Sequence, residues 1–99
     1  MSGPNVYEAE YTVGSELGLH ARPAGQFVVL ASRFASEISV GRGADWVDGR
    51  SVLSLLSLAA GRGTRLRIRA VGPDAQAAVE ALGRVLEEQY AAPPRPPAG

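Results

Sequence analysis

The segment 64–70 constrains the fold of this chain more than any other stretch of its sequence. Mostly apolar side chains alternate there with arginines, in the order Thr64, Arg65, Leu66, Arg67, Ile68, Arg69 and Ala70. Because successive side chains of a β-strand point to opposite faces of the sheet, this period of two predicts a strand with one apolar and one charged face. Sheets with one face in water are typically antiparallel. The chain is therefore expected to contain an antiparallel sheet that is covered on one side only.

The three arginines of this strand allow two interpretations. If the strand pairs with the segment 7–13, Glu8 and Glu10 lie near the arginines, and each opposite-charge pair contributes about 0.2–1 kcal/mol. This pairing is the favoured interpretation. The alternative is an RNA-binding sheet face, for which the sequence offers no clear aromatic pair on which bases could stack.

Periodicity elsewhere in the sequence predicts three more strands and three helices. Strands are expected at 7–13, 38–40 and 46–47, and helices at 23–35, 52–58 and 75–90. The helices carry apolar stripes that must be buried against one face of the sheet. The predicted fold class is α+β, with a four-stranded antiparallel sheet and three helices on one of its faces.

Length and composition are those of one small globular domain. The chain has 99 residues, of which 45% are hydrophobic, and it has no cysteine and one histidine. This composition excludes disulfides and thiolate metal sites, and neither a metal nor another cofactor is expected. Ten arginines balance ten acidic residues, a neutral charge that argues against general nucleic-acid affinity. One folded domain at 1–91 and a disordered, proline-rich tail at 92–99 are expected.

Nothing in the sequence indicates a membrane protein. No apolar run is long enough to span a bilayer. The residues after Met1 lack the basic and apolar regions of a secretory signal. The expected location is the cytoplasm, without a membrane partner.

The segment 18–24 places the single histidine at the start of a predicted helix. Its sequence is Gly-Leu-His-Ala-Arg-Pro-Ala, in which His20 precedes a proline suited to the first helical position. The N–H groups at a helix start have no intrahelical acceptor and favour an anion. Arg22 adds a planar fork of donors that matches phosphate oxygens. The pattern favours a histidine that carries a phosphoryl group over one that merely caps the helix.

This heptapeptide closely resembles the active-site signature of the HPr family, the histidine-containing phosphocarriers of the sugar phosphotransferase system. A second block, at 50–58, resembles the regulatory-serine helix of the same family, and the resemblance extends from about Val6 to about Tyr90. It implies an open-faced β-sandwich that acts as a monomer. It also implies that His20 accepts phosphate on Nδ1 from enzyme I and passes it to an enzyme IIA, while Ala21 and Arg22 bind the phosphate. Such a chain is a phosphoryl carrier and not an enzyme.

Ser51 combines a local role with a role implied by the resemblance. Its hydroxyl suits the N-cap of the short helix that follows. The resemblance implies that it is a regulatory phosphorylation site, with HPr kinase/phosphorylase as a further partner. Ser54 and Ala59 stand where many regulated relatives have glycine. The block also resembles the nitrogen-linked branch of the relay, so a regulatory or nitrogen-branch paralogue remains the alternative.

Four apolar residues are candidates for partner docking. Leu53 and Leu56 fall on a different face of the short helix from Val52 and Leu55. The resemblance implies that such leucines form an exposed docking patch. Leu19, next to His20, is expected to extend the patch, and Phe27 is expected to form its margin on the first helix.

Overall fold

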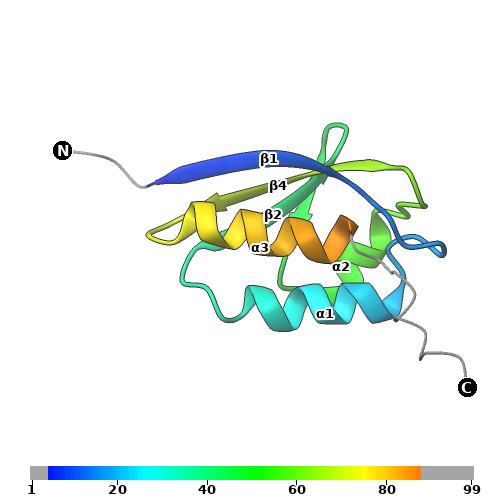
Figure 1. The fold of residues 1–99 in the computed structure, drawn as a ribbon, viewed down its shortest axis with the longest axis horizontal. Coiled ribbons are helices and arrows are strands. Elements are labelled where there is room, and N and C mark those ends of the chain that lie inside the picture. The colour runs from blue at the N-terminus through cyan, green and yellow to red at the C-terminus, as the bar shows by residue number, and fades with distance from the viewer. Residues whose placement is uncertain (1–4, 88–99) are drawn as a thin grey trace, which may run out of the picture.

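The computed structural model describes residues 5–87, which form a sheet with helices on one of its faces (Figure 1). The elements follow the predicted order: β1 Val6–Thr12, α1 Ala21–Ala31, β2 Glu37–Arg42, β3 Asp45–Asp48, α2 Val52–Ser57, β4 Arg65–Val71 and α3 Ala75–Glu87. None of the helices within the described range is long and apolar enough to cross a membrane. The predicted tail at 92–99, the domain boundary at 91 and the helical Tyr90 lie outside the described residues.

The sheet is antiparallel throughout, with the strand order β1-β4-β2-β3. In its register Glu8 faces Arg69 and Glu10 faces Arg67. Ion-pair distances between these glutamates and the three arginines are 3.8–4.0 Å. The predicted pairing of the first and last strands is confirmed, and so is the proximity of their opposite charges.

One arginine of the exposed sheet face has further partners. The guanidinium carbon of Arg67 lies 4.6 Å from the ring centroid of Trp46, and a terminal nitrogen donates to the carbonyl of Gly43. The Trp46 ring itself covers Gly41, where an added Cβ would lie 2.8 Å from the ring. Because the arginines of this face are engaged within the chain, their alternation needs no nucleic-acid ligand.

The core lies between the sheet and the helices. The inward side chains of β4, namely those of Leu66, Ile68 and Ala70, are fully buried, as their alternation predicts. The helices cover them with residues at helical spacing: Ala24, Phe27 and Ala31 from α1, and Ala78, Val79 and Leu82 from α3. This packing leaves the end of the sandwich near the start of α1 available for a site.

Helix α1 begins two residues earlier than predicted and ends four residues earlier. Pro23 is therefore its third residue and not its first, a position where the missing N–H is equally harmless. At the other end, the Asp74 carboxylate accepts the N–H groups of Ala35 and Ser36 at 2.9 and 3.0 Å. This contact holds the loop after α1 against the start of α3, which no local pattern in the sequence could indicate.

Candidate functional site

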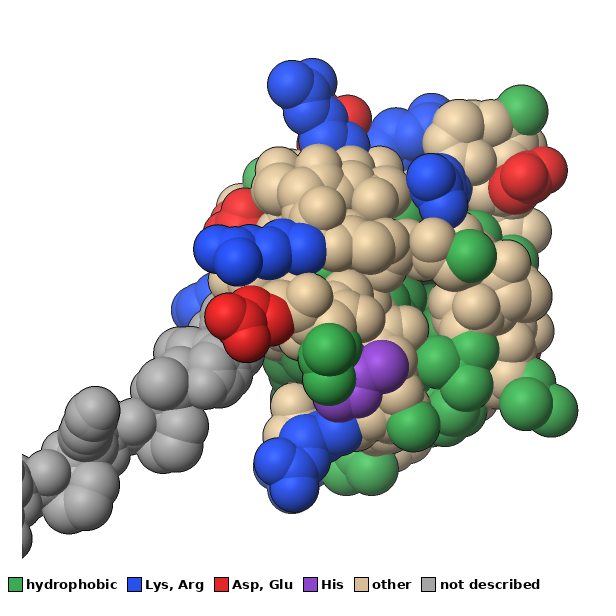
Figure 2. Space-filling model, turned by 90° about the vertical axis from the view of Figure 1, so that its right-hand side faces the viewer, with side chains coloured by type: hydrophobic (Ala, Val, Ile, Leu, Met, Phe, Trp, Pro, Cys, Tyr) green, Lys and Arg blue, Asp and Glu red, His purple; other side chains and the backbone are tan. Residues whose placement is uncertain are grey.

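His20 is the N-cap residue of α1. Its backbone is extended, and its side chain makes no capping hydrogen bond. The backbone is nevertheless held on both sides, because its N–H donates to the Gly18 carbonyl at 2.9 Å and its carbonyl accepts from Ala24 at 3.0 Å. The imidazole is half-buried at the surface, where hydrophobic side chains lie next to it (Figure 2). The backbone of His20 is therefore held in place, and its ring is partly exposed.

The loop before His20 is anchored to the segment after α2. The N–H of Leu19 donates to the Ala60 carbonyl at 2.8 Å. Gly18 has a φ of 77°, and a Cβ there would lie 2.5 Å from the Ala60 oxygen. Only glycine combines this backbone conformation with so close an approach. The glycine of the heptapeptide thus sets the position of the histidine two residues later.

The start of α1 is suited to an anion. Ala21 and Arg22 are its first two residues, so their N–H groups have no intrahelical acceptor. No acidic residue lies in the first turn to offset the positive end of the helix dipole. Both residues are exposed, so the Arg22 guanidinium is available to a phosphate on His20. His20, the predicted phosphoryl acceptor, and Ala21 and Arg22, the predicted phosphate-binding residues, are thus consecutive at the start of the helix.

Ser51 is the N-cap of α2, as the sequence predicts. Its hydroxyl oxygen accepts the N–H of Ser54 at 3.1 Å, and its carbonyl accepts the N–H of Leu55 at 3.0 Å. The residue is half-buried at the start of the helix. A phosphate on this oxygen would still lie where helix N–H groups favour negative charge.

Arg50 has a structural function that sequence reasoning missed. One terminal nitrogen lies 3.1, 2.8 and 2.9 Å from the carbonyl oxygens of Ala31, Phe34 and Ser36. A cation at the carboxyl end of a helix is electrostatically favourable and satisfies its last carbonyls. Arg50 therefore joins the end of α1 to the start of α2. Its partners are 14–19 residues away in sequence, so no local signal could have revealed them.

Two of the four predicted docking residues are buried, and the expectation that they are exposed is wrong. Phe27 is 0% exposed because it lies on the same helical face as Ala24 and Ala31. Leu19 is also buried, because its backbone hydrogen bond holds it against Ala60. Neither side chain belongs to an exposed patch.

The two leucines of α2 fit the prediction better. Leu53 is 79% exposed and Leu56 is half-buried, whereas Leu55 lies in the core. Leu17 and Val29 are also exposed, at 78% and 63%, and sequence reasoning missed both. Leu17 lies in a loop, where no periodicity predicts exposure. Val29 lies on α1, whose apolar stripe predicts which side chains are buried but not which apolar side chains are exposed.

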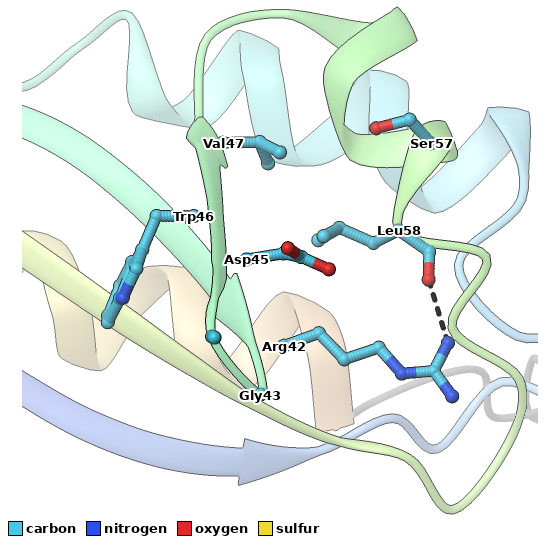
Figure 3. A pocket seen from close by; sticks show the side chains of 8 residues that line it. Arg42, Gly43, Asp45, Trp46, Val47, Ser57 and Leu58 are labelled. Carbon is cyan, nitrogen blue, oxygen red and sulfur yellow. Dashed lines mark hydrogen bonds between the residues drawn. The ribbon is translucent and has the colours of Figure 1, made fainter.

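A separate open pocket of about 740 Å³ lies at the other end of α2 (Figure 3). The β2–β3 turn and the end of the helix line it, and Arg42 crosses it to donate to the carbonyls of Leu58 and Ala59 at 2.8 and 3.0 Å. These bonds satisfy carbonyls at the end of α2. The lining includes neither His20 nor Ser51, so this pocket is distinct from the candidate site.

Residues 7–88 match the family described as PTS HPr component phosphorylation site. The chain is 43% identical over 82 residues to the phosphocarrier protein HPr of Pseudomonas putida, covering 82% of this chain and 91% of that one. It is 36% identical over 83 residues to the phosphocarrier protein NPr of Shewanella violacea, covering 84% and 91%. The crystal structure of HPr from Bacillus anthracis matches with a TM-score of 0.78 and 34% identity, over 82% of this chain and 96% of that one.

The fold and the histidine at the start of α1 define a small phosphoryl carrier and not an enzyme. The chain belongs to the HPr family of phosphocarriers of the phosphotransferase system. This finding confirms the resemblance that the two motifs indicated. It also confirms the predicted α+β sandwich, with a four-stranded antiparallel sheet and three helices.

Proposed function

We propose that His20 accepts a phosphoryl group from enzyme I and passes it to an enzyme IIA of the phosphotransferase system. The observation that carries this proposal is the N-cap position of His20, with its backbone held on both sides and its ring making no capping hydrogen bond. Family membership supports a relay role for this residue, since the family is described by its phosphorylation site.

The transfer is a displacement at phosphorus. A ring nitrogen of His20 that bears a lone pair attacks the phosphorus, and the new N–P bond forms while the bond from phosphorus to the donor breaks. The Arg22 guanidinium and the N–H groups of Ala21 and Arg22 stabilise the charge on the phosphoryl oxygens. The same contacts serve the reverse step, in which the phosphoryl group leaves His20 for the next acceptor.

Incubation with enzyme I and phosphoenolpyruvate tests the assignment of His20. We expect one acid-labile phosphoryl group per chain, measured as a mass increase at neutral pH that is lost in acid. His20→Ala should abolish the increase while circular dichroism stays unchanged, because the side chain makes no capping bond. Labelling that persists in this variant would show that another residue carries the phosphate.

Regulation through Ser51 is a further part of the proposal. A phosphate there adds about −1.5 to −2 charges at neutral pH, two residues from the exposed Leu53. The charge is favourable to the helix but imposes a desolvation cost on any partner that covers Leu53. Ser51→Asp should therefore slow phosphorylation of His20 by enzyme I without loss of helicity, and Ser57→Asp, at the last residue of α2, is the matched control. Equal rates for wild type and Ser51→Asp at low salt would refute this regulatory effect.

The similarity to NPr favours a second candidate, a carrier for a parallel branch of the relay. Phosphorylation of this chain by the first enzymes of both branches, compared as kcat/KM, distinguishes the two candidates. A ratio above about tenfold in favour of one donor assigns the branch.

We also propose that the carrier acts as a monomer in the cytoplasm. Its charged sheet face is satisfied by ion pairs within the chain and offers no large apolar surface to a second copy. The absence of cysteine is in keeping with a reducing compartment. Light scattering at micromolar concentration measures the mass in solution and tests the monomer.

A further inference from the structure

The loop that carries His20 rests on the turn after α2, residues 58–61. The N–H of Leu19 donates to the Ala60 carbonyl at 2.8 Å, and the His20 N–H donates to the Gly18 carbonyl at 2.9 Å. Gly18 is in direct contact with the same turn, because a Cβ there would lie 2.5 Å from the Ala60 oxygen. A shift of the Ala60 carbonyl therefore moves the backbone at His20.

This turn is not part of a helix or a strand. It lies between the end of α2 at Ser57 and the start of β4 at Arg65. Ala59 has a φ of 50°, a left-handed conformation that is unfavourable for a residue with a Cβ. The carbonyls at the end of a helix also lack intrahelical donors. The carbonyls of this turn therefore need donors from outside α2.

Arg42 supplies these donors. It is the last residue of β2, and its side chain extends across to the turn after α2 (Figure 3). One terminal nitrogen, Nη1, donates to the carbonyl of Leu58 at 2.8 Å and to that of Ala59 at 3.0 Å. These two residues directly precede Ala60. The Arg42 side chain therefore holds the turn next to the carbonyl that binds Leu19.

The backbone of Arg42 is itself held by the sheet. Strand β2 pairs with both β3 and β4, and Arg42 lies opposite Asp45 in the β2–β3 register. The guanidinium is thus attached to a strand and not to a loop that moves with the turn. Arg42 is exposed, but both of its hydrogen bonds are charge-assisted and so are stronger than bonds from a neutral donor. One side chain in this way links the sheet to the loop of His20.

We propose that Arg42 is a positioning residue for phosphoryl transfer at His20. It holds the turn after α2, and the Ala60 carbonyl of that turn holds Leu19 and with it the histidine. The inference rests on the proposed function of His20. Arg42 touches neither the phosphoryl group nor the imidazole in this proposal. Because reacting atoms must lie within about 3–3.5 Å of one another, a small shift of the loop is enough to slow transfer.

Both hydrogen bonds come from one nitrogen, which allows a selective substitution. Arg42→Met keeps much of the aliphatic stem and removes the donors, whereas Arg42→Lys retains one charged nitrogen that can donate to both carbonyls. Arg62→Met is the matched control, because Arg62 is an exposed arginine two residues after Ala60. Transfer is followed in a single turnover from phosphorylated enzyme I over a range of carrier concentrations. Amide hydrogen exchange of the unphosphorylated variants is measured by NMR.

The limiting rate of transfer in Arg42→Met should fall about fivefold, while the carrier concentration at half-saturation stays within about twofold. Exchange of the Leu19 amide should become about tenfold faster, because the carbonyl that it binds is less well held. The Gly49 amide, which donates to the Ile38 carbonyl of β2, should exchange as in wild type. Arg42→Lys should lie between Arg42→Met and wild type in both measurements, and Arg62→Met should equal wild type.

The outcomes separate this inference from the function beneath it. If Leu19 exchange is unchanged in Arg42→Met, or if Leu19 and Gly49 accelerate alike, Arg42 does not hold this loop and the inference is wrong. A wild-type limiting rate despite faster Leu19 exchange also overturns it, as does a change in half-saturation alone. In these cases the function of His20 stands, provided that wild type is phosphorylated. If wild type is not phosphorylated, the proposed function fails and the inference fails with it, although Leu19 exchange still shows whether the link to Arg42 exists.

Discussion

At the residue scale, the chemistry of the site depends on groups that are oriented by the backbone and not by other side chains. His20 is held by hydrogen bonds of its own N–H and carbonyl, and the N–H groups proposed to bind the phosphate belong to the next two residues. Such a site needs few residues in a short segment, which is why one heptapeptide can specify it. The Arg22 guanidinium adds a side-chain donor to these backbone N–H groups.

Replacement of Arg22 tests that contribution. A charge-assisted hydrogen bond is worth about 1.5–3 kcal/mol, so Arg22→Ala should lower kcat/KM for transfer roughly tenfold to a hundredfold. Arg22→Lys should recover part of the rate, because a point charge cannot reproduce the planar fork. Quench-flow kinetics with enzyme I measures the rate, and Arg33→Ala, an exposed arginine just past the end of α1, is the control. Wild-type kinetics in Arg22→Ala would exclude this role.

At the element scale, the short helix α2 depends on contacts at both of its ends. Ser51 caps its start and Arg50 ties that start to α1, while Arg42 donates to carbonyls at its end. A helix of six residues has little stability of its own, so these contacts determine where Leu53 is displayed. Ala59, just past the helix, is the weak point of this arrangement.

Ala59 adopts a left-handed backbone conformation with a φ of 50°. This conformation costs a residue with a Cβ about 1–2 kcal/mol, and glycine avoids the cost but gains freedom in the unfolded chain. Ala59→Gly should therefore raise the free energy of unfolding by about 0.5–1 kcal/mol. Urea denaturation measures the change. Ala44→Gly, at an exposed position without positive φ, should give no such gain, and equal effects of the two substitutions would contradict the explanation.

At the scale of the whole molecule, Asp74 connects segments that are far apart in the chain. Its carboxylate accepts the Ser36 hydroxyl at 2.6 Å and the N–H groups of Ala35 and Ser36, so the loop between α1 and β2 is joined to the start of α3. The hydrogen bond from Ser36, followed by that from Ala35, holds the pKa of Asp74 below its usual value. The ionised form is therefore the form that stabilises the fold.

This lowered pKa predicts a loss of stability in acid. A group whose pKa is lower in the folded than in the unfolded chain contributes stability above the unfolded value, near pH 4, and this contribution disappears as the pH falls through the folded value. Asp74→Asn should make the free energy of unfolding less dependent on pH between pH 5 and pH 2. Ser36→Ala should make the acid loss smaller, since it removes the donor that lowers the Asp74 pKa most and so brings the folded pKa closer to the unfolded value. Identical pH profiles for wild type and Asp74→Asn, measured by urea denaturation, would show that other groups control acid stability.

The sequence by itself determined the elements and the position of His20 at the start of a helix, because both depend on neighbours in the chain. Alternation over 64–70 predicts a strand with one solvent-exposed face. The heptapeptide around His20 contains the glycine, the helix start and the arginine of the proposed site. The N-cap function of Ser51 is local in the same sense.

Only the tertiary structure decided which apolar side chains reach the surface. Leu19 and Leu17 are two residues apart, yet a hydrogen bond to Ala60 buries one and the turn displays the other. Phe27 is buried because α1 turns that face towards the sheet and α3. Arg50 binds the last residue of α1 across a separation of 19 residues. Exposure and long-range capping depend on how elements pack against one another. The periodicity of a segment does not show which distant residues contact it.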